Sequence, residues 1–216
     1  MVICGDKELL IMEKSFYTPS EKIATKLQEL ANVMQEKFDN KIICSNYSFG
    51  ELSVTVNKDS LLDVITFLRN DPRYLFRQLS DITAVDYPEK ENRFTLVYQL
   101  LSLSFNLRVR IKIEITESYV VPSVFNQYSN ADWLEREVFD MFGIYFSDHP
   151  DLRRILTDFG FEGYPLRKDF PLSGHTEVYF DKETQQVKYK PVELEQEYRN
   201  FSSINPWLNL DKNKSN

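Results

Sequence analysis

The carboxylates of residues 135–140 are the first place where this sequence has the residue types for catalysis. Glu135, Glu137 and Asp140 stand close together in a helical stretch, and paired carboxylates can act as general acid and general base. Glu135 and Glu137, however, are two residues apart, which separates them by about 200° around a helix, so they cannot face one substrate. A hydrolase that uses Glu135 or Glu137 is therefore only a minor alternative.

Other kinds of reactive site find little support. The chain has two histidines and two cysteines, Cys4 and Cys44, without the spacing of a ligand set, so we expect reduced thiols and no zinc or iron–sulfur site. Gly160 and Gly163 do not form a phosphate cradle, because no strand leads in and no helix leads out. We also find no Ser/His/Asp or Cys/His set. The sequence therefore predicts no catalytic, cofactor-binding or metal-binding residue in this chain.

Composition narrows the class of protein. The formal charge of −7 argues against a general nucleic-acid or membrane-surface binder, which would carry a basic excess. No run of about 18 apolar residues is present, so we expect no direct membrane span. The first residues, MVICGDKELLIMEKS, lack the pattern of a signal or transit peptide. We therefore expect the protein to stay in the compartment where it is made.

The elements that must position these residues follow from periodicity. Apolar residues at intervals of three and four predict helices, and alternation predicts strands. Helices are predicted at 20–39, 59–71 and 130–142, and strands at 41–48, 52–56, 79–86, 93–101 and 107–115. The order is helix, two strands, helix, three strands, helix. It predicts a two-layer α+β domain with a mixed sheet over residues 1–146.

Residues 147–216 have a different texture. Five of the nine prolines and three of the six glycines lie there, and no period of 2 or 3.6 lasts. The segment is nevertheless rich in apolar and aromatic residues, which is not typical of disorder. We therefore predict an irregular C-terminal arm without elements of its own, which becomes ordered by docking on a partner.

The last predicted helix has specific expected ends and faces. Ser129 and Asp132 resemble a capping box at its start, and Gly143 is expected to end it in the left-handed conformation. Asp132, Arg136 and Asp140 are spaced four residues apart, so we expect a ladder of exposed ion pairs opposite the core face.

Glu135 falls instead at the edge of the apolar face. A carboxylate there needs a partner, and we expect Arg153 or Arg154 to provide it, at a cost of about 3 to 5 kcal/mol if the pair is broken. These charges are expected to fix the helix to the loop that follows. Truncation after about residue 147 is expected to leave a folded domain that no longer assembles.

Three motifs carry a family resemblance. They are EREVFDMFG at 135–143, HPDLRRILTDFG at 149–160 and GYPLRKDFP at 163–171. Together they resemble the signature of the thirty-kilodalton subunit of respiratory complex I, which is the C subunit in bacteria and NADH dehydrogenase subunit nine in some organelle genomes. The signature residues, which we expect at an interface or in a structural role, are Glu135, Arg136, Glu137, Asp140, Gly143, His149, Pro150, Arg153, Arg154, Gly160, Gly163, Arg167, Lys168, Asp169 and Pro171. Tyr164 departs from the pattern, since many relatives carry His there.

The resemblance implies a structural subunit of the peripheral arm of proton-pumping NADH:ubiquinone oxidoreductase, without a cofactor of its own. FMN, iron–sulfur clusters, NADH and quinone would be bound elsewhere in the complex. The implied partners are chiefly the forty-nine-kilodalton subunit of the quinone module and the subunit that carries the terminal iron–sulfur cluster.

The resemblance also implies a location, on the matrix side of the mitochondrial inner membrane or, alternatively, on the cytoplasmic face of a bacterial plasma membrane. The alternative function is a stand-alone protein-interaction module of the same fold.

Overall fold

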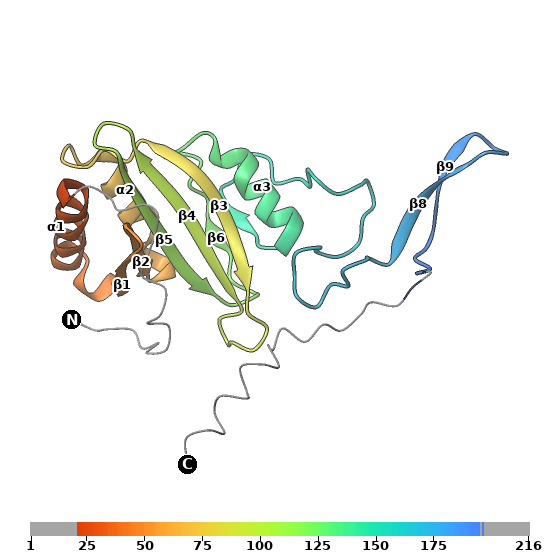
Figure 1. The fold of residues 1–216 in the computed structure, drawn as a ribbon, viewed down its shortest axis with the longest axis horizontal. Coiled ribbons are helices and arrows are strands. Elements are labelled where there is room, and N and C mark those ends of the chain that lie inside the picture. The colour runs from red at the N-terminus through yellow and green to blue at the C-terminus, as the bar shows by residue number, and fades with distance from the viewer. Residues whose placement is uncertain (1–20, 195, 197–216) are drawn as a thin grey trace, which may run out of the picture. The chain divides into compact units, whose positions relative to one another are not determined.

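The computed structural model describes residues 21–194 and 196. Within them, three α-helices and nine strands follow one another as shown in Figure 1. The elements are α1 (Glu21–Lys37), β1 (Ile42–Ser48), β2 (Glu51–Val56), α2 (Leu61–Asn70), β3 (Gln78–Asp86), β4 (Phe94–Ser102), β5 (Leu107–Ile115), β6 (Val121–Pro122), α3 (Ala131–Phe142), β7 (Phe146–Ser147), β8 (Thr176–Asp181) and β9 (Gln186–Pro191). Short 3-10 turns at Asp39–Lys41 and Lys58–Ser60 precede β1 and α2.

Five strands form the central sheet, in the order β1-β2-β5-β4-β3. The β2–β5 pair is parallel and the other pairs are antiparallel, so the sheet is mixed. Along β5 the odd-numbered residues are buried, whereas Arg108 and Glu114 are exposed. The buried residues of all three helices join those odd-numbered residues in one core cluster. The helices therefore cover one face of the sheet, which gives two layers.

The predicted fold class is confirmed, and the predicted strands of the sheet agree with the structure to within one residue at each end. Alternation was reliable along β5 because its odd-numbered residues are buried on one face and its even-numbered residues are polar, whereas Thr95 and Val97 of β4 are buried on the other face as well. None of the helices that the structure describes is long and apolar enough to cross a membrane. The expectation of a reduced thiol at Cys4 and the predicted start of the first helix at residue 20 concern residues outside the described range.

The sequence missed the hairpin of β8 and β9, because it predicted no elements after residue 146. Backbone pairing joins these strands from Thr176 and Pro191 to Asp181 and Gln186. Apolar side chains do alternate along both strands, but most of them are exposed. The alternating stretches are short, and neither has a buried face among the described residues. The sequence alone therefore did not distinguish them from irregular structure.

Chain contacts divide the described residues into two compact units, one that ends at Pro171 and one that begins at Leu172. The first unit therefore contains the sheet, the three helices and the loop of residues 148–171. The predicted division at residue 146 lies inside this unit. The docking of the later segment on a partner stays a prediction.

We expect a fragment that ends at Pro171 to keep the thermal midpoint of the full chain to within about 2 °C, because it removes only the second unit. A fragment that ends at Ser147 is expected to melt about 10 °C lower, since it removes the loop donors of two buried carboxylates, described below. Circular dichroism melting of both fragments checks this. Equal midpoints would show that the loop contributes nothing to the fold.

Candidate functional site

Helix α3 positions most of the signature residues. Its end agrees with the prediction, because Gly143 adopts φ +75° at the C-cap and its N–H donates to the carbonyl of Phe139. The predicted capping box is wrong, since the cap residue is Asn130 and no side chain caps the helix. The Asn130 amide instead donates to the carbonyl of Leu79 on β3, at 2.8 Å. Asp132 turns toward His149, with 3.4 Å between Oδ1 and Nε2.

Glu135 is completely buried, and its predicted pairing with an arginine is wrong. Its carboxylate accepts hydrogen bonds from the Ser123 hydroxyl at 2.6 Å and from the Val124 N–H at 2.8 Å. Burial raises the pKa of the Glu135 carboxyl above its ordinary value, although these two hydrogen bonds act in the opposite direction. Arg153 and Arg154 are bound elsewhere, as described below, so the segment before the helix provides the donors.

Asp140 is also completely buried, so the predicted exposed ladder is wrong. Its Oδ2 accepts the backbone N–H groups of Ile155, Leu156 and Thr157 at 3.0, 2.7 and 3.0 Å, and its Oδ1 accepts the Thr157 hydroxyl at 2.7 Å. Burial raises the pKa of Asp140, but these hydrogen bonds outweigh it, so the pKa lies below its ordinary value. One carboxylate thus holds a whole turn of the loop.

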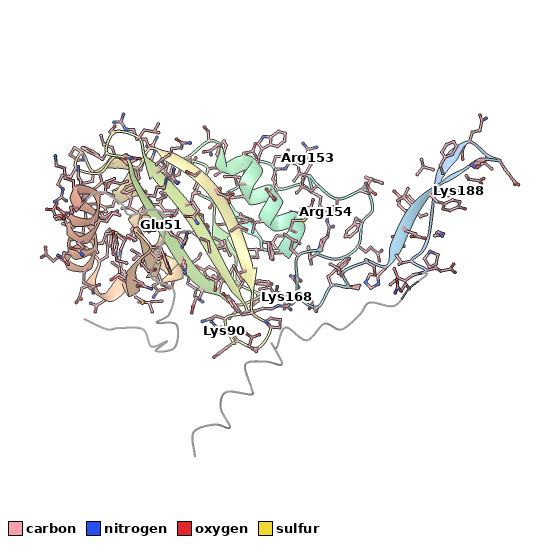
Figure 2. All side chains as sticks on the ribbon, in the orientation of Figure 1. Glu51, Lys90, Arg153, Arg154, Lys168 and Lys188 are labelled. Carbon is pink, nitrogen blue, oxygen red and sulfur yellow. The ribbon has the colours of Figure 1, made fainter. Side chains whose placement is uncertain are left out.

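Two of the three nearby arginines, Arg136 and Arg154, reinforce the same loop. Arg136 donates to the carbonyls of Arg153 and Arg154 at 3.0 and 3.3 Å. Arg154 donates to the carbonyl of Gly163 at 2.9 Å and lies 3.5 Å from the Asp140 carboxylate. Arg153 points outward and pairs with its neighbour Asp151, so it contributes little to stability. Figure 2 labels Arg153 and Arg154 on this loop.

The end of α3 is enclosed by the RKDFP motif. Arg167 donates to the carbonyl of Phe142 at 2.6 Å and also bonds Glu117. A Cβ on Gly143 would lie 2.6 Å from the ring of Tyr164 and 2.7 Å from the Arg167 guanidinium. Glycine is therefore required at this position for two reasons, its positive φ and the close approach of the loop.

A third buried carboxylate, Asp86 at the end of β3, anchors the rest of the motif. Arg93 donates to it through two bonds of 2.7 and 2.9 Å, and the backbone N–H of Lys168 donates at 2.8 Å. The Arg93 guanidinium holds the pKa of the Asp86 carboxyl below its ordinary value. Arg93 also pairs with Asp169 at 2.9 Å. The label of Lys168 in Figure 2 marks this point, next to the end of β3.

The remaining signature residues have weaker roles. Glu137, Pro150, Gly160 and Pro171 are exposed. Gly163 adopts φ +100°, and a Cβ there would lie 2.8 Å from the Phe170 ring. The structure thus brings most of the signature into one network between α3 and residues 149–169.

Sequence reasoning missed several residues of this network, namely Asp86, Arg93, Ser123 and Thr157. Asp86 left a signal, because it occupies an inward position in the alternating strand that includes Ile82 and Ala84. No sequence pattern marked the other three residues, since they are common polar residues in turns or at strand ends.

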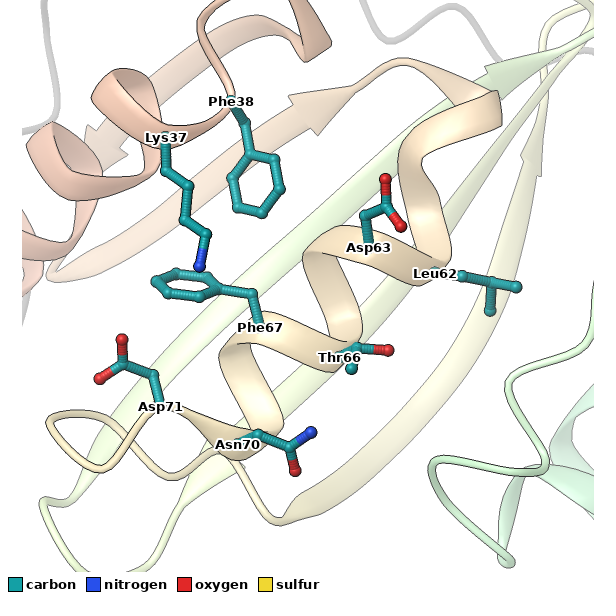
Figure 3. Close-up of a pocket in the computed structure, with 8 residues that line it drawn as sticks. All are labelled: Lys37, Phe38, Leu62, Asp63, Thr66, Phe67, Asn70 and Asp71. Carbon is teal, nitrogen blue, oxygen red and sulfur yellow. The ribbon is translucent and has the colours of Figure 1, made fainter.

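The buried carboxylates of the network already accept hydrogen bonds from donors within the chain itself. Within the described part of the chain, no three His, Cys, Asp or Glu side chains form a group that could hold a metal ion. A shallow cavity of about 590 Å³ lies elsewhere, between α1 and α2, and no signature residue lines it. There Lys37 extends over the ring of Phe67, 4.1 Å from its centroid, beside Phe38 (Figure 3). The main role that the geometry supports for the signature is to fix a long loop onto one helix.

The fold and the site define a two-layer α+β protein in which buried carboxylates fasten a loop to the last helix of the domain. Residues 54–176 match the family model described as respiratory-chain NADH dehydrogenase, 30 Kd subunit. The chain therefore belongs to this family and is a subunit of a multi-subunit respiratory complex, as the resemblance in sequence predicted.

Bacterial relatives, each named as the C subunit of NADH-quinone oxidoreductase, agree with this assignment. The protein of Brucella ovis is 50% identical over 185 residues, which cover 86% of this chain and 92% of the relative. That of Dinoroseobacter shibae is 51% identical and covers 84% of each chain. A chain in the structure of the membrane-bound sulfane sulfur reductase, an archaeal respiratory membrane complex, is 27% identical with a TM-score of 0.56. The match covers 67% of this chain and 85% of that one.

Replacing Asp140 by Asn is expected to destabilise the chain by about 2 to 4 kcal/mol at pH 7, because an amide cannot accept all four hydrogen bonds. Since the folded pKa is depressed, the contribution of Asp140 is complete above the unfolded value of about 3.9 and is lost as pH falls through the lower folded value. Urea unfolding at pH 7 and below pH 4 checks both parts. Glu137→Gln, on the exposed side of the same helix, is the control and should change stability by less than about 0.5 kcal/mol.

Gly143→Ala and Gly160→Ala separate backbone strain from close packing. The two glycines have nearly equal φ values, +75° and +79°, but a Cβ at Gly160 meets no atom within 4 Å. We expect Gly160→Ala to cost about 1 to 2 kcal/mol from backbone strain alone. Gly143→Ala should cost at least about 3 kcal/mol, because Tyr164 must also move. Chemical denaturation gives both values, and equal costs would contradict the close approach.

Proposed function

We propose that this chain is a structural, non-catalytic subunit of the peripheral arm of an NADH-quinone oxidoreductase. In this proposal it supports the quinone-reducing module and transfers no electrons itself. Family membership supports the complex, and the engagement of the buried carboxylates within the chain supports the non-catalytic role. FMN, iron–sulfur clusters, NADH and quinone would then be bound by other subunits.

The observation that carries the docking role is the exposed apolar face of the hairpin. Val178 and Phe180 on β8 lie opposite Tyr189 and Val187 on β9, so the four side chains share one face. They are 52%, 59%, 62% and 61% exposed, respectively. A two-stranded hairpin is at best marginally stable alone in water. An apolar surface of this kind is typical of a protein interface.

The opposite face of the hairpin is charged and paired within itself. Glu177 bonds Lys190 at 2.7 Å, and Asp181 bonds Lys188, which is labelled in Figure 2. These cross-strand pairs form within the hairpin and need no partner subunit, so this face can remain in contact with water. The hairpin therefore has one face for water and one face for another protein.

We propose the forty-nine-kilodalton subunit of the quinone module as the principal partner of the apolar face. The subunit with the terminal iron–sulfur cluster is the second proposed neighbour. The complex is membrane-bound, and we place this chain peripherally, at the mitochondrial matrix side or the bacterial cytoplasmic side. The bacterial origin of the similar relatives is compatible with either location.

The test is to place a charge on the apolar face with Phe180→Asp. We expect at least a tenfold loss of the chain from the purified complex, since burying a phenylalanine contributes about 1.5 to 3 kcal/mol and a buried carboxylate adds a penalty. Oxidoreductase activity should fall in proportion to the assembled fraction. Blue-native electrophoresis and NADH:quinone turnover measure the two quantities.

Tyr179→Asp is the matched control, because this aromatic residue is adjacent in sequence but lies on the charged face beside Lys188. It should assemble normally. Normal assembly of Phe180→Asp would contradict docking by the hairpin. A native protein that migrates apart from every other subunit of the complex would favour a stand-alone module. Flavin or iron–sulfur absorbance in the purified chain would contradict the non-catalytic role.

A further inference from the structure

The side chain of His149 is completely buried between helix α3 and the start of the loop that the site fastens. Its Nδ1 lies 3.1 Å from the backbone N–H of Asp151, and its Nε2 lies 3.1 Å from the carbonyl of Asp132. Because Asp151 N–H is a donor, Nδ1 must present its lone pair and the ring proton must sit on Nε2. The structure therefore fits only the neutral Nε2–H tautomer of His149.

Carboxylates surround the other side of the ring. The Nε2 atom lies 3.4 Å from Oδ1 of Asp132 and 3.9 Å from Oε2 of Glu135, both on α3. Oδ1 of Asp132 is buried and has no hydrogen-bond partner among the described residues. The loop adds the carboxylate of Asp151, which is paired with Arg153. Carboxylate oxygens thus lie near the Nε2 side of the ring, whereas the Asp151 N–H lies at the Nδ1 side.

Two further elements lie close to this cluster. The Ser123 hydroxyl, before α3, is engaged by Glu135. The phenol of Tyr98 on β4 is buried near Glu135, and burial raises its pKa well above the ordinary value, so it stays neutral. The guanidinium groups of Arg153 and Arg136 lower the pKa of the Asp151 carboxylate. Histidine is the side chain that ordinarily changes charge between pH 5 and pH 8.

A protonated His149 is incompatible with the observed turn. The second proton binds Nδ1, which then becomes a donor and faces the Asp151 N–H at 3.1 Å. Two donors at this distance repel each other, so the turn must open or the ring must rotate. Proton binding and the shape of the loop are thereby coupled.

We propose that His149 is a proton-controlled latch for the loop of residues 149–157. The neutral ring holds the turn at Asp151 closed, and proton uptake from solvent at Nδ1 releases it. Beyond this turn, the loop is held by Arg136 and Asp140, so the release is local and leaves the rest of the fold intact. The latch concerns residues of the first unit alone and does not depend on the docking role of the hairpin.

The test is hydrogen exchange of the full-length chain, followed by NMR from pH 8 to pH 5. The rate for each amide is divided by that of an unstructured peptide at the same pH. We expect the corrected rate of the Asp151 amide to rise roughly five- to tenfold at low pH, as one hydrogen bond is lost. The rise should follow the ring nitrogen signals of His149, which should report the Nε2–H tautomer at pH 8.

His149→Asn removes the titration but keeps an acceptor at the position of Nδ1, so the Asp151 amide should stay protected at every pH. The chain has one other histidine, and His175→Asn is the matched control that should keep the pH dependence. Persistence of the dependence in His149→Asn would overturn the latch. If that variant does not fold, the wild-type spectra decide: titration of His149 without a change at the Asp151 amide would overturn it equally.

Discussion

The structure of the first unit depends on one constraint, that a carboxylate withdrawn from water must be surrounded by donors. Glu135, Asp140 and Asp86 are all buried, and each is satisfied by a different part of the chain. Glu135 fixes the segment before α3, Asp140 fixes a turn of the following loop, and Asp86 fixes Lys168 near the end of the unit. Because each carboxylate accepts backbone N–H groups, it specifies the path of the chain as well as its stability. A loop of more than 20 residues without regular hydrogen bonding is thereby given one conformation.

The two units use charge in opposite ways, and this difference suits a subunit of a larger complex. In the first unit the buried charges are turned inward and serve its own loop. In the hairpin the charges pair on the surface, and the apolar side chains are exposed. A partner that binds the hairpin can therefore gain hydrophobic contact without disturbing the network around α3. The loop of the first unit and the hairpin of the second thus use charged side chains for different purposes.

Local rules predicted the fold well and the site only in part. The strands of the sheet were visible because alternation matches a sheet with one buried face, and Gly143 was recognised because helix ends need a left-handed residue. The same logic failed for Asp140 and Glu135. A helical wheel assigned Asp140 to an exposed face, but the loop of residues 153–157 returns over that face and buries it. Arg153 or Arg154 was expected to pair with Glu135, yet Arg153 turns outward to its neighbour Asp151 and Arg154 lies near Asp140.

The sequence by itself determined the order of the three helices and the five strands of the central sheet, the two-layer architecture and the family, because these depend on periodicity and on nearly continuous motifs. It also singled out many residues of the network, although not their partners, and it missed Asp86, Arg93, Ser123 and Thr157. Only the tertiary structure decided which donors meet each carboxylate, since Asp86 and Lys168 are far apart in sequence and adjacent in space. It also revealed the hairpin of β8 and β9, whose apolar side chains are exposed. The physical reason is the same in both cases: a hydrogen bond or a contact depends on distance in space, and sequence spacing fixes that distance only within one helix, strand or turn.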